Sequence, residues 1–193
     1  MSSASLAIAA AYPRMASYAS EIVSVSERLG IDPHTLANLI NFESGGNVKA
    51  INPTSGASGL IQFMPSTARR LGTTVEAIRQ MSPAQQMVYV EKYLRPYKGK
   101  FTSPAAVYMS VFYPVAMTWP LTKEFPANVQ KANPGIKTPA DYARLVERRA
   151  KLKTAMVVAG TGFGLYVLVG LGITGYLLWK KRGERKAPSG GVS

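Results

Sequence analysis

The sequence predicts an all-α domain followed by a C-terminal transmembrane helix, and three observations carry this prediction. Proline repeatedly follows a residue that caps helices, a pair typical of a helix start. No stretch alternates apolar and polar residues convincingly, as a half-buried strand would. Residues 156–179 contain no charged side chain, and this run of 24 residues exceeds the roughly 20 that cross a bilayer as a helix.

The helices of the domain are expected to begin and end at recognisable signals. The expected starts are Asp32-Pro33, Ser82-Pro83, Ser103-Pro104 and Thr138-Pro139. Gly30 and Gly72 lie where helices would end. The sequence Thr73-Thr74-Val75-Glu76 predicts a capping box for a short helix. From about Ala140 a helix rich in Arg and Lys is expected to run on into the membrane span.

Five segments are expected along the chain. They are an N-terminal segment (1–16), the helical domain (17–142), a basic juxtamembrane helix (143–155), the transmembrane helix (156–179) and a basic tail (180–193). Two stretches of the domain, 44–58 and 112–137, lack periodicity. The first is expected to be either an ordered loop that carries function or a disordered one. The apolar stretch Leu6 to Tyr12 is short and has no preceding Lys or Arg, so no cleaved signal peptide is expected.

The charge distribution indicates a membrane partner. The net charge is +13, and many basic residues fall in 144–153 and 180–186, on both sides of the uncharged run, where lipid phosphates would lie. No nucleic-acid motif accompanies them, so no specific nucleic acid is expected. The chain has no Cys and one His, His34, expected on a helix surface. These counts argue against disulfides, metal sites and a Ser-His-Asp triad, and no cofactor is expected.

Glu43 is the residue that points to chemistry. Leu36, Leu39 and Ile40 define one buried face of the helix that begins at Pro33, and Glu43 comes next on that face. Apolar surroundings would disfavour its charged form and raise its pKa, which suits a general acid. The following Gly45-Gly46 pair would end the helix and leave the carboxyl group at the mouth of a cleft. The alternative, a frayed helix end with a solvated Glu, stays open.

A longer set of motifs surrounds this glutamate. It consists of Glu43-Ser44-Gly45-Gly46, then Asn52-Pro53, then Gly56-Ala57-Ser58-Gly59-Leu60-Ile61-Gln62-Phe63-Met64-Pro65-Ser66-Thr67-Ala68. The set resembles the signature of the soluble lytic transglycosylase family, relatives of goose-type lysozyme, in order and nearly in spacing, with about one extra loop residue. The resemblance is clear over 31–72, weaker to 142, and does not cover the uncharged run. It implies a lysozyme-like helical fold.

The resemblance implies a role for each matching position. Glu43 would be the catalytic acid and base, and Gln62 would contact the glycan near the scissile bond. Ser44 is a further expected substrate contact. Gly56 and Gly59 would shape the cleft wall, where the absence of a side chain lets the backbone approach a sugar closely. An ordinary turn is the alternative explanation for the two glycines.

The sequence departs from the family pattern at two places. Asn52 stands where the family usually has Ser in the loop, and we expect it to contact substrate, since either residue donates a hydrogen bond. The later Ala-Tyr-Asn-Ala-Gly motif has no clean counterpart; its nearest placement is Val111-Phe112-Tyr113-Pro114, which resembles the Phe-Tyr-Pro variant of phage-associated members. Tyr108 and Tyr113 are therefore expected either to contact a sugar or to be core residues. Tyr142 is a further candidate.

The small number of acidic residues near Glu43 in the sequence bears on which glycan-cleaving reaction is expected. A typical glycosidase uses two carboxylates about 5 to 10 Å apart, but the next acid after Glu43 is Glu76, and the chain has only two Asp. The resemblance implies that Glu43 cleaves the MurNAc-GlcNAc β-1,4 bond of peptidoglycan and forms 1,6-anhydroMurNAc. Two alternatives stay open: a hydrolytic lysozyme that uses Glu91 or Glu124, and a non-catalytic glycan-binding membrane protein.

The expected setting follows from the uncharged run. Gly160 and Gly164 form a Gly-x-x-x-Gly pair that favours self-association, although glycine is also simply tolerated in membrane helices. A transglycosylase with its own anchor and no signal peptide resembles wall-opening enzymes carried in bacteriophage virions, as an inner-membrane or internal virion component, which act while the genome enters the cell. A bacterial inner-membrane protein facing the periplasm is the alternative.

Overall fold

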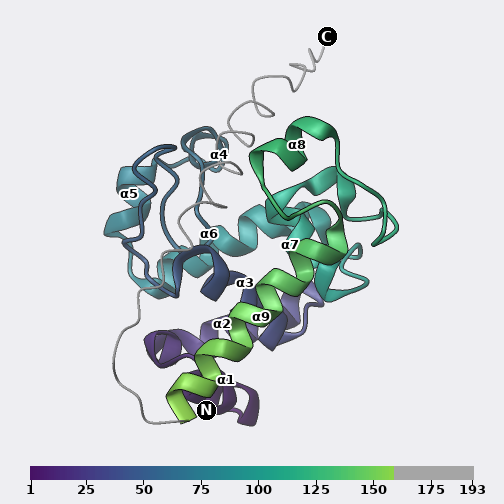
Figure 1. Cartoon of the computed structure of the whole chain (residues 1–193). Coiled ribbons are helices and arrows are strands. Elements are labelled where there is room, and N and C mark those ends of the chain that lie inside the picture. Colours follow the sequence, from purple (N-terminus) through teal and green to yellow (C-terminus); the bar gives the residue numbers. More distant parts are fainter. Residues whose placement is uncertain (159–193) are drawn as a thin grey trace.

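The computed structural model describes the backbone of residues 1–158 and the side chains of residues 1–151 (Figure 1). The α-helices are α1 (Ser3–Ala11), α2 (Ala19–Leu29), α3 (Pro33–Ser44), α4 (Pro65–Arg70), α5 (Val75–Gln80), α6 (Pro83–Leu94), α7 (Pro104–Phe112), α8 (Ala127–Ala132) and α9 (Pro139–Val158). Short 3₁₀ helices are η1 (Pro13–Tyr18), η2 (Arg95–Tyr97) and η3 (Pro114–Ala116). Extended pairing in these residues is limited to two isolated β-bridges at Ser58. The all-α class is therefore confirmed for this part of the chain.

The expected capping residues begin their helices. The Asp32 carboxylate accepts a hydrogen bond of 2.7 Å from the Thr35 N–H at the start of α3. Ser103 caps α7 through the Ala106 N–H, at 3.2 Å, and the Thr138 hydroxyl accepts from the Asp141 N–H at 3.2 Å where α9 begins. Each of these hydrogen bonds satisfies an N–H group that has no partner inside its helix.

The capping box lies one helix later than expected. Thr74 caps α5 by accepting from the Ala77 N–H, so Glu76 is the second residue of the helix and not the third. The box forms instead at α6, where the side chains of Ser82 and Gln85 each accept from the other residue's N–H. The expected short helix is confirmed, but the assignment of its box was wrong, because two adjacent threonines left the register ambiguous.

Helix α3 is the centre of the packing. Leu36, Leu39 and Ile40 are fully buried, and α1, α2, α7 and α9 all pack against this helix. In Figure 1, α9 runs diagonally across the front of α3, while α4 and α5 lie on one side of the molecule and α8 on the other. His34, near the start of α3, is exposed as expected. The buried face of α3 therefore has partners on several sides along its length.

The core is continuous across the expected segment limits at residues 16 and 142. Ile8 of α1 and Met15 of η1 are fully buried in the same cluster as the α3 side chains. On α9, Val146 and Ala150 are also buried in it. The first 16 residues and the first three turns of α9 thus pack as parts of the helical domain.

The second irregular stretch, 112–137, is partly helical. It contains η3 and the six-residue helix α8, so the expectation of an irregular segment was wrong for residues 127–132. The helix has no side-chain cap at its start, and Val129 is its one fully buried hydrophobic residue. A single buried hydrophobic residue among six gives no repeat of apolar positions, so the sequence does not indicate this helix.

None of the helices within residues 1–158 has both the length and the apolar character needed to span a membrane. Residues 159–179 of the expected transmembrane helix and the expected tail, 180–193, lie outside the described residues. Gly160 and Gly164, on which the expected self-association depends, also lie outside them.

An ion-pair network joins α2 to α6. Arg28 of α2 donates to the Glu91 carboxylate through Nε at 3.1 Å and Nη2 at 2.8 Å, and Arg95 donates to the other carboxylate oxygen. The Glu91 side chain is only 10% exposed. The hydrogen bond from Arg28 holds the pKa of Glu91 below its usual value, although burial acts in the opposite direction. The carboxylate is therefore ionised and paired at neutral pH.

We predict that Glu91→Gln lowers the free energy of unfolding by about 2 kcal/mol at pH 7, because part-buried hydrogen bonds from two guanidinium groups to a charged carboxylate are weakened or lost. A carboxyl group whose pKa is lower in the folded state stabilises the folded protein fully at pH values above its unfolded pKa, about 4.3. This stabilisation is lost as the pH falls through the folded pKa. The difference from wild type should therefore shrink below about pH 4. Urea denaturation at several pH values measures it. Glu76→Gln is the control. The Glu76 side chain is 71% exposed and its carboxylate lies 3.9 Å from Arg79, so its loss should leave stability nearly unchanged.

Candidate active site

Glu43 lies in the last turn of α3. The helix ends at Ser44, and Gly45 follows in the left-handed conformation with φ 63°, donating its N–H to the Asn41 carbonyl at 2.9 Å. This conformation costs little only for glycine, so the chain can turn away directly after the glutamate. Glu43 itself is half-buried. Its carboxyl group thus lies between the core and the surface.

Helix α9 covers this carboxyl group with a tyrosine. The Tyr142 hydroxyl donates to Glu43 Oε1 at 3.4 Å, a long hydrogen bond. The Tyr142 ring is 1% exposed, stacks on Phe112 with centroids 4.1 Å apart, and meets the edge of Phe42 at 5.4 Å. Burial, and then the nearby Glu43 charge, raises the pKa of Tyr142 well above its usual value. The hydroxyl therefore stays protonated and serves as a donor.

A cation from the same helix lies beside Phe42, the residue before Glu43. Arg149 is seven residues after Tyr142, about two helical turns, and so projects from the same side of α9. Its guanidinium lies 5.5 Å from the centroid of the Phe42 ring. Burial lowers the pKa of Arg149, while the charge of Glu43 acts in the opposite direction. A guanidinium remains protonated at physiological pH under such conditions, so a positive charge is held in this region.

The loop after α3 is ordered by its own polar groups. The Asn52 side-chain carbonyl accepts from the N–H groups of Thr54 and Ser55, both at 3.0 Å. The Asn52 backbone bonds to Ala57 and Gly56, both at 2.8 Å. Of the two expectations for residues 44–58, the structure supports the ordered loop. The observed loop extends further, to Met64, because α4 begins only at Pro65.

A tight turn at residues 59–63 follows this loop. Gln62 has a φ of 51°, a left-handed conformation that is uncommon for a residue with a side chain. Its side-chain amide and its backbone N–H both donate to the Gly59 carbonyl, at 3.1 Å each, and the residue is 4% exposed. A non-glycine residue in this region costs free energy, and such costs cluster at functional sites.

Gly59 faces the interior of the protein. A Cβ atom at Gly59 would lie 2.6 Å from Gln86 Oε1 and 2.8 Å from Ile78 Cγ2. Gln86 is fully buried and is held by hydrogen bonds to Leu60 N–H, Val48 O and Ile78 O. Internal packing therefore accounts for this glycine, and the expected role in the cleft wall is not needed to explain it.

The conformation of Gly56 fits the alternative explanation for this glycine, an ordinary turn. It has a φ of 73°, and a Cβ atom there would come no closer than 3.6 Å to Pro65. Ser44 and Asn52 also make local contacts, since Ser44 donates to the Ile40 carbonyl of its own helix at 3.1 Å and Asn52 holds the turn described above. Their contact with substrate stays a prediction.

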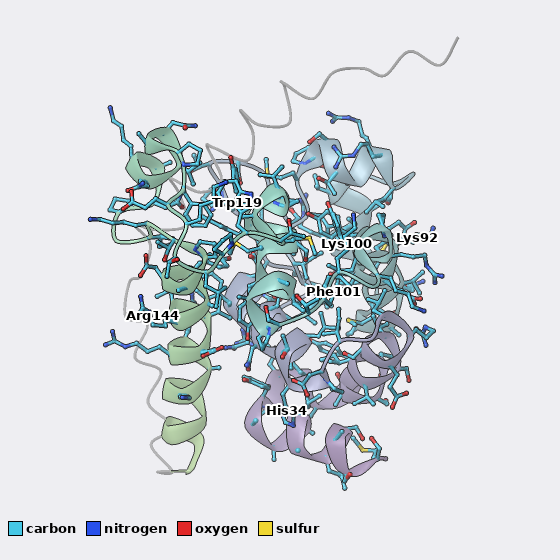
Figure 2. All side chains as sticks on the ribbon, turned by 90° about the vertical axis from the view of Figure 1, so that its right-hand side faces the viewer. His34, Lys92, Lys100, Phe101, Trp119 and Arg144 are labelled. Atoms are coloured by element: carbon cyan, nitrogen blue, oxygen red, sulfur yellow. The ribbon has the colours of Figure 1, made fainter. Side chains whose placement is uncertain are left out.

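The two candidate tyrosines of α7 differ in position. Tyr108 is 1% exposed, and burial raises its pKa to about 12. Of the two expectations for Tyr108, its burial in α7 supports the core residue. Tyr113, at the end of α7, is half-buried, with its ring centroid 5.6 Å from Trp119 and 5.5 Å from Phe125. The Lys123 Nζ atom lies 4.1 Å from the centroid of the Trp119 ring, which is labelled in Figure 2.

The sequence indicates Tyr142 only as a further candidate, and it does not single out Arg149. The cluster 144–153 was expected to face lipid phosphates as a whole, but its members differ. Arg144 is exposed, points away from the fold in Figure 2 and pairs with Asp141 at 2.5 Å, whereas Arg149 is half-buried. The seven-residue spacing from Tyr142 is the signal that distinguishes Arg149 from its neighbours.

The other acids proposed as partners of Glu43 are engaged elsewhere. Glu91 is held by Arg28 and Arg95, and Glu124 is exposed and accepts from Gln130 at 3.1 Å. Asp32 caps the opposite end of α3, eleven residues or about 16 Å along the helix axis from Glu43. Within the described residues, no group of three or more potential metal ligands occurs.

Two comparisons with known proteins match part of the chain. Residues 21–110 match the family described as "Transglycosylase SLT domain". The match includes α3, the loop and α7 up to residue 110, but not α9. A protein called "Transglycosylase" from Enterobacteria phage PRD1 is 40% identical over 53 residues, which are 28% of this chain and 20% of that relative. The aligned part thus spans about a fifth of the relative's length. No solved structure matches significantly. The helical structure of the described residues is consistent with a domain of the kind that this family model describes.

We predict that Gly59→Ala lowers the free energy of unfolding by about 3 kcal/mol, because strain at positive φ adds to a clash with the buried Gln86 and Ile78 side chains. Gly72→Ala is the matched control, with a φ of 79° and nothing within 4 Å of the added Cβ, and should cost only about 1 kcal/mol. Urea denaturation of both variants gives the difference. Equal losses would show that Gly59 is not required by packing.

Proposed function

We propose that this protein is a peptidoglycan lytic transglycosylase in which Glu43 is the catalytic acid and base. The observation that carries the proposal is the position of Glu43: a half-buried carboxyl group at the glycine-terminated end of α3, with the Tyr142 hydroxyl 3.4 Å away. The match of residues 21–110 to the transglycosylase domain supports this assignment. The substrate is the β-1,4 bond between MurNAc and GlcNAc in peptidoglycan glycan strands.

The reaction divides into two proton transfers through one residue. Protonated Glu43 gives its proton to the glycosidic oxygen as the bond to the MurNAc C1 atom breaks, and GlcNAc leaves. The resulting carboxylate then takes the proton of the MurNAc 6-hydroxyl, whose oxygen bonds to C1 and closes the 1,6-anhydro ring. Glu43 ends protonated, as it began. The Tyr142 hydroxyl supports the intermediate carboxylate, because a donor to the charged form favours that form.

The placement of the other acids supports this chemistry over hydrolysis. A hydrolase requires a second carboxylate about 5 to 10 Å away to act as nucleophile or to activate water. Glu91 and Glu124, the two candidates for that role, are bonded to residues away from α3. A reaction that uses the substrate's own hydroxyl group needs no such partner.

We predict that Glu43→Gln lowers muralytic activity at least about 1,000-fold while leaving the fold intact, because glutamine neither donates nor accepts the transferred proton. Activity is measured on purified peptidoglycan, and circular dichroism checks folding. Mass spectrometry of the wild-type products should show muropeptides ending in 1,6-anhydroMurNAc. Reducing-end MurNAc in their place would mean a muramidase, and full activity in the folded variant would overturn the assignment of the acid.

We further propose that the uncharged run 156–179 anchors the protein in a membrane as a single-pass segment, and that the protein acts in a phage virion, opening the cell wall locally while the genome enters the cell. The length of the run and the basic residues on both sides support the anchor. The similarity to a protein from a phage supports the setting.

We predict that the full chain floats with liposomes in a density gradient and stays bound in about 1 M salt and at alkaline pH, since a spanning segment is not held by surface charge alone. Replacing residues 156–179 by a Gly/Ser linker of equal length should leave the protein unbound under these conditions. Salt-released binding of the full chain would contradict the anchor. Detection of the protein in purified phage particles tests the virion setting, and its recovery only from the bacterial inner membrane would contradict it.

A further inference from the structure

A chain of contacts connects Arg149 to Glu43. The guanidinium lies over the Phe42 ring at 5.5 Å, Phe42 meets Tyr142 edge to face at 5.4 Å, and the Tyr142 hydroxyl reaches Glu43 at 3.4 Å. Phe42 and Glu43 are consecutive residues of α3, and α3 and α9 pack against each other. A ring face attracts a cation, so Phe42 holds the guanidinium beside the end of α3.

We propose that Arg149 is a positioning residue of this site, which stabilises the ionised form of Glu43 by supplying a fixed, partly buried positive charge. The proposal rests on the proposed function, in which Glu43 becomes a carboxylate halfway through the reaction. At that moment a negative charge forms in a half-buried position, where water screens and solvates it poorly. A fixed cation offsets this cost without having to reorganise.

The location of Arg149 is consistent with such a role. An arginine that served only the surface would extend into water, as Arg144 does. Arg149 is instead half-buried, and burial lowers its pKa, which means that it gives up solvation of its charge. The charge of Glu43 and the Phe42 ring offset part of this loss. The dependence is mutual, because a charge interaction that favours Arg149 favours Glu43 equally.

The elements packed against α3 carry several other titratable groups. Helix α2 carries Glu21, Glu27 and Arg28, and Arg28 pairs with Glu91. The titratable side chains of α3 are His34 and Glu43, and α7 contributes Tyr108. Helix α1 has none within Ser3–Ala11. On α9 the groups nearest to Arg149 in the sequence are Glu147, Arg148 and Lys151, while Tyr142 faces Glu43 from the same helix. The pKa of Tyr142 is raised well above its usual value, so its titration does not enter a profile measured between pH 4 and 9.

The test compares Arg149→Gln and Arg149→Met with Arg149→Lys in the full-length protein. Arg148→Gln is the matched control, because it removes one positive charge from the same helix at an exposed position. The first readout is the midpoint of the Glu43 carboxyl titration by 13C NMR in detergent micelles, with the resonance assigned by its absence in Glu43→Gln. The second is the pH profile of kcat/KM for anhydro product formation on a defined glycan fragment.

Loss of the cation disfavours the carboxylate, so Glu43 stays protonated to higher pH. In Arg149→Gln and Arg149→Met we expect the NMR midpoint and the alkaline limb of the profile to move to higher pH, with kcat reduced about tenfold. Arg149→Lys should keep the midpoint close to wild type, and Arg148→Gln should not move it. Arg149→Met keeps an apolar stem over Phe42, so it serves as the folded variant if Arg149→Gln is unstable.

An unchanged midpoint in a folded Arg149 variant overturns the proposal, even if activity falls, because removing a charge that stabilises the carboxylate must shift its titration. The NMR readout requires no turnover. A wild-type protein that makes no anhydro product would therefore refute the proposed function, and the titration would still decide whether Arg149 stabilises ionised Glu43.

Discussion

The half-buried carboxyl group of Glu43 depends on the packing of α9 against α3. The two helices are separated by almost 100 residues of sequence, yet the Tyr142 hydroxyl reaches Glu43 across their interface. Burying a carboxyl group without partners is costly, and an ionised group costs more. α9 provides a hydroxyl donor and a nearby cation, and it also closes the core with Val146 and Ala150. One interface thus completes both the fold and the candidate site.

Local features of the sequence predicted much of the fold. The Ser-Pro, Asp-Pro and Thr-Pro pairs mark helix starts because the first residue caps the helix and the proline has the φ angle of its first turn. Both effects act within a few residues of the chain. The position of Glu43 also followed from local spacing, since Leu39 and Ile40 lie one turn before it on the same helix face. The end of α3 could be predicted from Gly45 alone, because glycine readily adopts the left-handed conformation that ends a helix.

Contacts between distant segments were the part that spacing could not supply. Tyr142 looked like a minor candidate because nothing in its surroundings shows that it meets Glu43. Gly59 was expected to face a sugar, but Gln86, 27 residues later, occupies the space beside it. Arg149 was counted with its basic neighbours because charge is visible in a sequence and burial is not. In each case the deciding partner lies on another element.

The continuity of α9 sets a length scale for the molecule. From Tyr142 to Met156, where the uncharged run begins, the helix rises by about 21 Å, and no break interrupts it. If residues 156–179 span a bilayer as proposed, the continuous helix α9 would hold the Glu43 carboxyl group at a nearly constant height above the lipid surface. The enzyme would then reach only the glycan layers that pass within about two nanometres of the membrane. Under that proposal, such a geometry would restrict cutting to a local patch of the wall.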